Sequence, residues 1–553
     1  MKNRRDMKTI KLEDKIIYQI FPRSFYDSNN DGDGDLLGIA KKLDYLQDLG
    51  INAIWLCPIY DTNFVDAGYD VLDYKSVWKQ FGTLEDFKLL TTEARKRNID
   101  IIMDIVLNHV SNEHEWFKKA CESEDNIEHN YFIWRKELNK EEKEAKSIFG
   151  GSAWEYVPSV KKYYFHLFAK EQVDLNWNHQ DTVKAMSDVI DFWYGLGVRG
   201  FRLDAIKHVS KNFEETLTNS CFAWCKGADN MLLKFNKLAF SDKKDAYTLG
   251  EASGINLEEL LKYGTGSKKV ADNYYNFSWW WIGWGKETGR NGYDSNWDYK
   301  EFVYQQQPFQ HSTKVLPSMT TNFLSNHDTS RSISRWGDEN IFHKESAKSH
   351  ALMLFGLKGI PCIYYGEEIG LLNNQFNSRE EFKDCDIFNA FSELVDKKKI
   401  YSEYEFIKYC NINSRDSGRT LMQWDNYAVN NGFNEGQKTW IKTNQRAQWI
   451  SVQNNLEDKN SILNFYKKII ALRSKKYHDI LVLGKSQIDL QNSGIIQITR
   501  TFNKQKIVIL INMTKHQKVV ENVQGKQILS TYIDNKKVTD KLRPFESIML
   551  EIK

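Results

Sequence analysis

Gly197-Val-Arg-Gly-Phe-Arg-Leu-Asp-Ala-Ile-Lys-His-Val209 places a charged pair inside a stretch that otherwise has the composition of a buried β-strand. Arg202 and Asp204 are two residues apart, so on an extended strand both side chains leave the same face. A guanidinium beside a carboxylate favours the charged form of that carboxylate. The pair therefore predicts either an ion pair that only stabilises the strand or an ionised carboxylate that acts as a nucleophile.

The segments around this strand alternate between short apolar strands and helices. Residues 36–49 have helical spacing, and Thr83-Leu-Glu-Asp86 is typical of a capping box that opens the next helix. Eight strands that alternate with helices predict an α/β fold, a (β/α)8 TIM barrel. The expected strands cover residues 16–21, 53–57, 99–106, 200–205, 247–252, 273–277, 320–324 and 360–365.

Two interruptions and a change of pattern divide the chain into domains. Residues 111–180, rich in aromatic and charged side chains, predict a subdomain inserted after strand 3, and residues 372–460, polar and rich in Asn, predict a second excursion. Beyond residue 480 short alternating strands predict a C-terminal antiparallel β-domain. We expect a catalytic barrel of residues 1–110 and 181–480, an inserted subdomain of residues 111–180, and a C-terminal β-sandwich of residues 481–553.

The composition restricts the class of partner. The 76 basic and 74 acidic residues give a net charge of +2, so no global field favours nucleic acid or an anionic membrane. No apolar run approaches the roughly 20 residues of a membrane span, and no apolar segment follows the basic start as in a secretory signal. Seven cysteines without a C-x-x-C motif fit reduced thiols. We expect a cytoplasmic monomer or weak homo-oligomer whose partner is uncharged or small.

Polar residues gather where strands 3, 4, 5 and 7 end, and in a barrel these ends share the face on which active sites lie. A retaining glycosidase needs two carboxyl groups about 5–5.5 Å apart, one ionised to attack the sugar and one protonated to serve the leaving oxygen. Asp204 suits the first role, and Glu251 suits the second because burial and nearby anions are expected to raise its pKa. Asp328 is a third carboxylate that could hold sugar hydroxyls, with His109 and His327 as neutral partners. Catalysis needs no cofactor.

These four segments resemble, in the same order, the four signature regions of the α-amylase family, glycoside hydrolase family 13. The resemblance implies that Asp204 is the nucleophile, Glu251 the acid/base and Asp328 the transition-state stabiliser. It also implies supporting positions for Asp104, Asn108, His109, Arg202 and His327.

Two further stretches resemble one branch of that family, the oligo-1,6-glucosidases and α-glucosidases. Ser414-Arg-Asp-Ser-Gly-Arg-Thr-Leu-Met-Gln-Trp-Asp425 is similar to the SRDxxRTPMQWD segment of that branch, with Leu421 in place of proline. In Asp66-Ala-Gly-Tyr-Asp70, Tyr69 matches a tyrosine that stacks on the sugar in the innermost subsite. The resemblance implies that Arg415 pairs with Asp66, which closes the pocket and makes the action exo.

Arg331, three residues past Asp328, also matches a substrate-binding position of the branch, although Thr329-Ser330 replaces the usual Gln-Pro.

Asp27-Ser-Asn-Asn-Asp-Gly-Asp-Gly-Asp35 places oxygen donors at every second position, which suits a hard cation such as Ca²⁺ or Mg²⁺. An EF-hand is excluded, because residues 36–49 supply no glutamate at the twelfth loop position. The first βα loop of the resembled family binds a structural cation, and a solvated acidic turn is the alternative. The implied ligands are Asp27, Asn29, Asp31, the main-chain carbonyl of Asp33, and Asp35.

The preferred linkage depends on the residue after the nucleophile. In the resembled branch this residue tends to be valine in α-1,6-acting enzymes and smaller in α-1,4-acting ones, and here it is Ala205. Lys207-His208 resembles a pair common in α-1,4-acting amylases. We therefore expect a retaining exo-α-glucosidase that acts on maltose and malto-oligosaccharides. The alternative is an oligo-1,6-glucosidase for isomaltose-type substrates.

Other interpretations each require a further feature. A sucrose isomerase is expected to carry an RLDRD-type loop, which the sequence lacks. A hydrolase of sucrose or of trehalose 6-phosphate is a further alternative, and the enzyme for trehalose 6-phosphate would need a basic cluster at the pocket mouth. A non-catalytic relative, such as the heavy chain of an amino-acid transporter, would lack the carboxylates and carry a membrane span. Phe277-Ser-Trp-Trp-Trp-Ile-Gly-Trp284 could line the aglycone subsites or pack under a loop.

Overall fold

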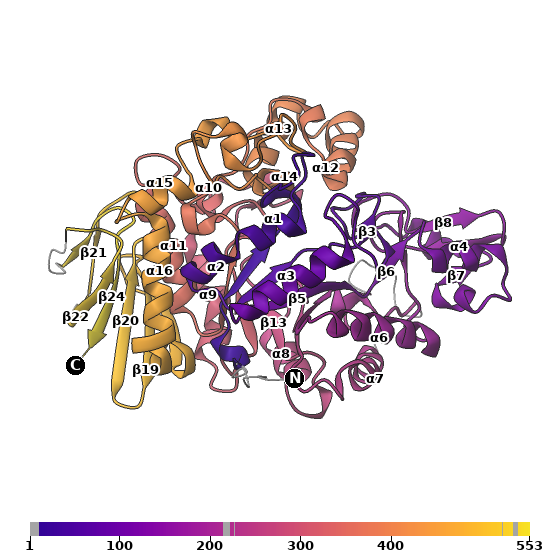
Figure 1. Ribbon diagram of the computed structural model, residues 1–553, viewed down its shortest axis with the longest axis horizontal. Helices are drawn as coiled ribbons and strands as arrows, with labels where there is room; N and C mark the ends of the chain where they lie inside the picture. Colours follow the sequence, from indigo (N-terminus) through magenta and orange to yellow (C-terminus); the bar gives the residue numbers. More distant parts are fainter. Residues whose placement is uncertain (1–9, 214–221, 226, 522–523, 535–539, 553) are drawn as a thin grey trace.

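A closed barrel of eight parallel strands forms the centre of the molecule (Figure 1). The computed structural model describes residues 10–213, 222–225, 227–521, 524–534 and 540–552. All eight expected strands are present with ends shifted by a few residues at most, so the predicted TIM barrel is confirmed. In order around the barrel they are β1 (Ile17–Ile20), β17 (Ile360–Tyr364), β16 (Thr320–Asn322), β13 (Asn273–Tyr275), β12 (Tyr247–Gly250), β11 (Gly200–Asp204), β5 (Asp100–Val106) and β2 (Ala53–Leu56).

Helices on the outside of the barrel cover the apolar faces of the strands. Thr83 opens α3 as predicted: its side chain accepts a hydrogen bond from the N–H of Asp86, whose carboxylate reaches back to the N–H of Thr83. The single helix expected over residues 36–49 is instead two helices, because Lys42 leaves the helical conformation with φ −103° and ψ 6°. The helices are α1 (Leu36–Lys41), α2 (Leu43–Leu49), α3 (Leu84–Lys96), α6 (Gln180–Gly195), α7 (Ala228–Phe240), α8 (Leu257–Gly264), α9 (Tyr299–His311), α10 (Ser332–Trp336), α11 (His343–Gly356) and α16 (Ile462–Ala471).

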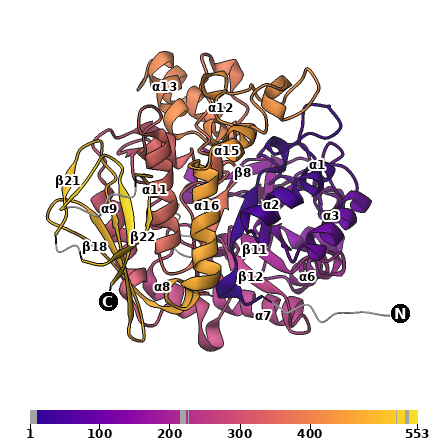
Figure 2. The ribbon, with the colours of Figure 1, turned by 60° about the vertical axis from the view of Figure 1, so that its left-hand side comes forward.

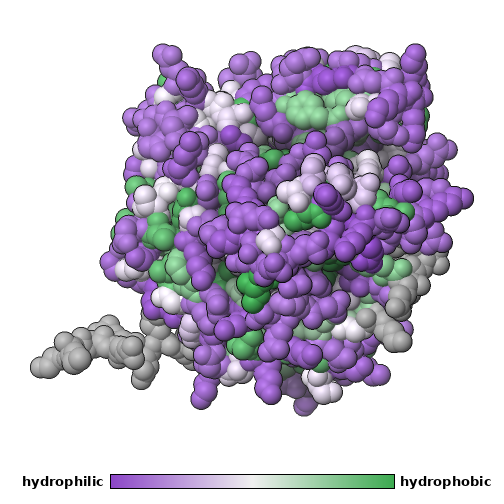
Figure 3. Space-filling model, turned by 90° about the vertical axis from the view of Figure 1, so that its right-hand side faces the viewer, coloured by the Kyte–Doolittle hydropathy of each residue, from purple (hydrophilic) through white to green (hydrophobic). Residues whose placement is uncertain are grey.

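The chain between β5 and α6 projects from the side of the barrel, at the right of Figure 1. Strands β7, β9 and β8 form a three-stranded antiparallel sheet, while β6 and β10 pair close to the barrel. The face of the molecule that carries this insertion is mostly hydrophilic, with scattered apolar side chains (Figure 3). Its elements are β6 (His109–Ser111), α4 (Glu115–Glu122), β7 (Trp134–Arg135), α5 (Lys140–Glu144), β8 (Trp154–Val157), β9 (Lys162–Phe165) and β10 (Gln172–Asp174).

A second excursion follows β17 and lies at the top of the molecule in Figures 1 and 2. It has an apolar cluster of its own, which includes the buried rings of Phe376, Phe382 and Phe406. This small core holds the polar loops of the excursion in place. The helices are α12 (Cys385–Ala390), α13 (Glu403–Asn413), α14 (Arg415–Gly418) and α15 (Val452–Glu457).

The C-terminal part of the chain is an antiparallel β-domain, as predicted. Its five-stranded sheet packs on α9 and α11, and Figure 2 shows α16 beside α11 on the barrel side. Within the described ranges, no helix is long and apolar enough to cross a membrane. The strands of the sheet are, in order, β18 (Lys485–Leu490), β19 (Ile496–Phe502), β20 (Gln505–Ile511), β24 (Ser547–Ile552) and β22 (Lys526–Ser530), and β21 (Lys518–Val519) pairs with β23 (Lys541–Leu542).

Candidate active site

A cavity of about 380 Å³ lies at the carboxyl ends of the barrel strands. Side chains from the strand ends form its floor, and the inserted subdomain, the loop after β13 and the second excursion form its walls. The lining residues are Asp66, Tyr69, His109, Ile148, Phe149, Phe168, Asp204, Ala205, His208, Glu251, Ser253, Trp280, Trp284, Arg290, Asn291, Asp328, Asp386 and Arg415.

Arg202 brings three of the expected carboxylates together. Its guanidinium donates hydrogen bonds to Asp104 Oδ1, at 2.8 Å, and to Asp204 Oδ1, and its Nη2 lies 3.7 Å from Glu251 Oε2. The register explains this arrangement, because Arg202 on β11 is paired with Asp104 on β5 and Glu251 follows the neighbouring β12. Arg202 and Asp104 are fully buried, whereas Asp204 reaches the cavity.

Burial raises the pKa values of two carboxyl groups in this cluster, Asp204 and Asp104. Burial raises the pKa of Asp204 well above its usual value, Arg202 opposes this shift, and the anions Glu251 and Asp104 add to it. Burial likewise raises the pKa of Asp104 to about 6, against the opposing effect of Arg202. One guanidinium is thus shared between three carboxylates, and its charge offsets only part of the effect of burial on Asp204. Asp204 therefore ionises at a higher pH than an ordinary aspartate.

Glu251 is held by the chain that follows Asp204. The main-chain N–H of Ala205 donates to Glu251 Oε2 over 2.7 Å. Ala205 itself has φ +46° and ψ +32°, a left-handed conformation that residues other than glycine rarely adopt. Its methyl group lines the cavity, where the sequence analysis placed it.

Asp328 lies on the opposite wall, between an imidazole and a guanidinium. Its Oδ2 is 3.2 Å from His327 Nε2 and its Oδ1 is 3.4 Å from Arg415 Nη1. Burial raises the pKa of Asp328, but the contact with His327 and the positive charges of Arg415, Arg419 and Arg202 lower it by more, so this carboxyl stays ionised. The net shift of its pKa is opposite in direction to that of Asp204.

His327 is a neutral imidazole in a chain of hydrogen bonds. Burial lowers its pKa to about 3. Its Nδ1 lies 2.7 Å from Gln19 Nε2 and its Nε2 lies 2.6 Å from the hydroxyl of Tyr69, which donates to Asp104 Oδ2 over 2.9 Å. The rings of Tyr69 and His327 are stacked, with centroids 5.4 Å apart. Tyr69 is thereby fixed where it lines the cavity.

His109 occupies the wall nearest the inserted subdomain, and burial lowers its pKa to about 4. Its Nε2 lies 3.0 Å from Gln172 Nε2, and the same amide donates to Asp66 Oδ2 over 3.1 Å. Gln172 belongs to β10 of the insertion, so the subdomain positions two expected site residues. Gln172 was not among the expected site residues.

Arg415 connects the second excursion to the barrel. Its Nη2 is 3.0 Å from Asp66 Oδ1, the pair that the resemblance implies, and its Nε and Nη2 donate to the two carboxylate oxygens of Asp384. Burial raises the pKa of Asp384, but Arg415 and Arg419 lower it by more, to about 2. Asp384 was not among the expected site residues.

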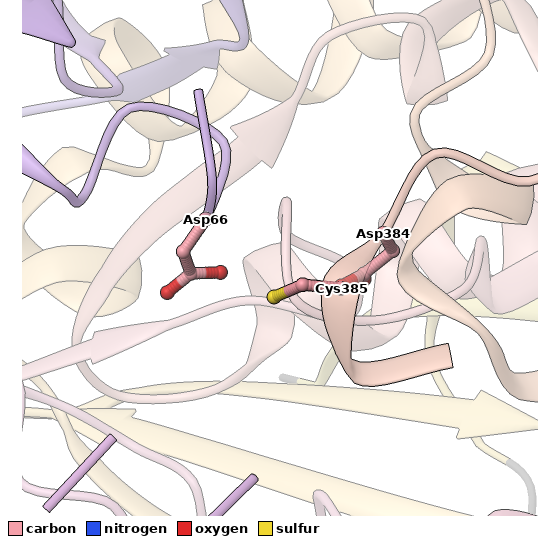
Figure 4. Close-up of side chains that lie close together, drawn as sticks. All are labelled: Asp66, Asp384 and Cys385. Carbon is pink, nitrogen blue, oxygen red and sulfur yellow. The ribbon is translucent and has the colours of Figure 1, made fainter. Parts of the chain in front are cut away.

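Asp66, Asp384 and Cys385 lie close enough to share a metal ion, and Figure 4 shows their side chains together. The donor set does not fit one well, because Arg415 already supplies the positive charge between the two carboxylates. Burial also raises the pKa of the Cys385 thiol far above its usual value, so it is a poor ligand. We interpret this group as part of the Arg415 network.

The mouth of the cavity is formed by aromatic and charged side chains that the sequence analysis left mostly unassigned. The hairpin of β14 (Trp284–Gly285) and β15 (Gly289–Tyr293) carries Arg290, whose Nη2 lies 2.8 Å from Asp386 Oδ2 of α12. Trp280 and Trp284 line the cavity with ring centroids 5.1 Å apart. Trp279 is instead buried, so one part of the aromatic patch of residues 277–284 lines the cavity and another part packs inside the protein.

Arg331 is placed away from the cavity, which corrects its assignment to substrate binding. Its Nη1 donates to the main-chain oxygen of Tyr365 over 2.8 Å, and its guanidinium lies over the rings of Tyr364 and Tyr365. The side chain is fully buried and stabilises the loops behind the site.

The acidic loop of residues 27–35 fits a cation only in part. The side chains of Asp27, Asn29 and Asp31 each accept a hydrogen bond from the N–H two residues further on. Asp33 pairs with Arg23, and Asp35 accepts from the N–H of Gly38 as the N-cap of α1. Donors occupy both oxygens of Asp35, from Ser28 and the helix cap, and both oxygens of the buried Asp27, from Asn30, Gly32 and Asn434. The pairing of Asp33 with Arg23 involves the Asp33 side chain and not its main-chain carbonyl.

Comparison with known proteins agrees with this geometry. Residues 19–484 match the family described as the catalytic domain of alpha amylase. The chain is 35% identical to the oligo-1,6-glucosidase of Parageobacillus thermoglucosidasius, over 99% of this chain and 100% of that protein. It is 34% identical to the glucan 1,6-alpha-glucosidase of Streptococcus pneumoniae serotype 4, over 97% and 98%.

Solved structures share the whole architecture. The trehalose-6-phosphate hydrolase of Bacillus licheniformis, in a mutant form, superimposes with a TM-score of 0.90 at 30% identity and covers 98% of this chain and 99% of that one. The isomaltulose synthase of Protaminobacter rubrum gives the same TM-score, identity and coverage. A barrel with this arrangement of carboxylates, together with such relatives, defines a glycoside hydrolase that acts on glucosides. The chain belongs to the α-amylase family, glycoside hydrolase family 13.

Proposed function

We propose that the protein is an exo-acting, retaining α-glucosidase that releases terminal glucose from short α-1,6-linked glucosides of the isomaltose type. The observation that carries the exo assignment is the contact of Arg415 with both Asp66 and Asp328 in the cavity wall. A pocket closed at this wall admits the terminal glucose of a glucoside and excludes glucose units from the middle of a longer saccharide. The similarity over nearly the full length to two kinds of α-1,6-acting glucosidase supports the linkage.

In the proposed mechanism, Asp204 attacks the anomeric carbon while Glu251 gives a proton to the departing oxygen, and water then hydrolyses the glucosyl-enzyme with Glu251 as the base. Asp328, held ionised by its cationic neighbours, would accept hydrogen bonds from sugar hydroxyls and stabilise the developing positive charge. His109, a neutral imidazole in the cavity lining, can hydrogen-bond to the sugar without adding positive charge. His327, expected in the same role, is buried behind the cavity with its ring nitrogens held by Gln19, Tyr69 and Asp328, so it positions these residues instead.

The α-1,4 linkage expected from Ala205 becomes the second candidate. The small side chain of Ala205 in the cavity wall still favours it. One or two methyl groups change discrimination by only about 1–3 kcal/mol, so this residue weighs less than the full-length similarity.

The charges of the cavity disfavour a phosphorylated sugar. The two arginines of its described lining, Arg290 and Arg415, are both paired with carboxylates. A phosphate group would therefore meet an acidic wall without a cation available to bind it. The acidic lining residues are Asp66, Asp204, Glu251, Asp328 and Asp386.

A panel of isomaltose, maltose, sucrose, trehalose and trehalose 6-phosphate, assayed for glucose release, tests the proposal. We expect the highest kcat/KM with isomaltose, and NMR of the first product should show α-glucose. A clear preference for maltose would favour the second candidate. Release from trehalose 6-phosphate alone, or β-glucose as the first product, would contradict the proposal.

We also propose that the loop of residues 27–35 binds a structural Ca²⁺ or Mg²⁺ through Asn29, Asp31 and the carbonyl of Asp33. The supporting observation is that both Asn29 and Asp31 are exposed and lie side by side. Such an ion would stabilise the fold and take no part in the reaction.

A further inference from the structure

The peptide that joins Asp204 to Ala205 lies between the two carboxylates of the proposed mechanism. Its N–H donates to Glu251 Oε2 over 2.7 Å, and Arg202 Nη2 lies 3.7 Å from the same oxygen. In the part of the chain that the structure describes, these are the donors that approach the Glu251 carboxylate, and both approach Oε2. The two oxygens of Glu251 are therefore in different environments.

Directly after this N–H, Ala205 takes a left-handed conformation, which turns the chain back over Glu251. Such a backbone conformation is unfavourable for an L-residue, so surrounding contacts have to maintain it. Three main-chain hydrogen bonds do so: from Glu251 N to Leu203 O at 2.9 Å, from Ile206 N to Glu251 O at 3.2 Å, and from His208 N to Ala205 O at 2.8 Å. The chain thus turns sharply after β11 and wraps around Glu251.

We propose that the main-chain N–H of Ala205 is a positioning group for the acid/base, which assigns the transferable proton of Glu251 to Oε1. This inference rests on the proposed function. A carboxyl oxygen that accepts an N–H hydrogen bond is disfavoured as the site of the proton, so the proton resides on the other oxygen. Because the same peptide carries Asp204, it also fixes the separation between the nucleophile and the acid.

The hydrogen bond from Ala205 acts during the first step of the reaction, in which Glu251 gives up its proton. The O–H bond at Glu251 Oε1 breaks as the glycosidic oxygen takes the proton, and the bond from the anomeric carbon to that oxygen breaks as the bond to Asp204 forms. The electron pair of the O–H bond remains on the Glu251 carboxylate. The hydrogen bond from Ala205 strengthens at this moment, because its acceptor becomes charged.

Replacement of Ala205 by lactic acid, which turns the amide into an ester, removes this N–H and keeps the methyl group. Two substrates report on it: α-glucosyl fluoride, whose leaving group needs little protonation, and the better of isomaltose and maltose, whose leaving group needs a full proton. We expect kcat/KM for the disaccharide to fall by about 10- to 100-fold, and that for the fluoride by less than about threefold.

An ester at Ile206 is the matched control, since it removes a hydrogen bond to the main-chain oxygen of Glu251 and leaves the carboxylate contact intact. It should lower both kcat/KM values by the same factor. An equal loss on both substrates for the ester at Ala205, or no loss on the disaccharide, would overturn the positioning role. If the unmodified enzyme released glucose from neither substrate, the proposed function itself would fail, and the inference with it.

Discussion

Replacing Arg415 by methionine tests the network that closes the cavity. Arg415 contacts Asp66, Asp328 and Asp384, and its side chain is 5% exposed. Removing one partner of a buried ion pair costs about 3–5 kcal/mol of unfolding free energy. Arg419 remains 3.8 Å from Asp384, so we expect a loss of about 3 kcal/mol. The pKa of Asp384, about 2 against an ordinary 3.8, accounts for about 2 kcal/mol of this at neutral pH.

The pH dependence has a definite sign. Because the folded-state pKa of Asp384 lies below its unfolded value, its contribution is complete above pH 3.8 and is lost as the pH falls toward 2. The difference in stability between wild type and Arg415→Met should therefore be full at pH 7 and smaller at pH 3. Urea unfolding at the two pH values measures it.

Arg290→Met is the control. Among the described residues Arg290 forms one ion pair, with Asp386, and its side chain is 19% exposed. We expect a loss of about 1 kcal/mol or less. Glucose release should fall sharply in Arg415→Met, whose closed wall is lost, and less in Arg290→Met. A loss below about 1 kcal/mol for Arg415→Met, or equal losses for the two variants, would refute the reasoning.

Three further predictions concern the chemistry and the acidic loop. Asp204→Asn should lose glucose release by at least about 10³-fold with an unchanged circular-dichroism spectrum and melting temperature, and activity near wild type would exclude Asp204 as the nucleophile. Because burial raises the pKa of Asp204, kcat/KM should fall with decreasing pH well above pH 3.8. Asp104→Asn removes a neighbouring anion and should shift this acidic limb to lower pH, whereas an unshifted limb would disconnect the two groups. Millimolar Ca²⁺ should raise the melting temperature of the EDTA-treated wild type and not that of Asp31→Ala, and an equal response of both would place the ion elsewhere.

The sequence predicts the barrel and its floor well, because both follow from local patterns. Mostly apolar runs of five to eight residues define the expected strands, and a barrel brings their carboxyl ends to one face. Asp204, Glu251 and Asp328 could therefore be identified before any coordinates. The alternation of strands and helices says nothing, however, about which loop residues bend over that face.

The walls of the site depend on contacts that no local pattern contains. Asp384 meets Arg415 across 31 residues of mostly helical chain, and Gln172 reaches Asp66 across 106. Arg331 shows the opposite error, since a position three residues past Asp328 does not reveal on which side of the loop its side chain lies. The left-handed backbone of Ala205 is equally hidden, because only glycine signals such a conformation in a sequence.

The most direct test of the account is to trap the glycosyl-enzyme. Incubation with 5-fluoro-α-glucosyl fluoride, followed by peptide mass spectrometry, should find one fluoroglucosyl group per chain, attached to Asp204 and absent from Asp204→Asn. A label on another carboxylate, or rapid turnover of glucosides with no label at all, would contradict the claim that Asp204 is the nucleophile of a retaining α-glucosidase.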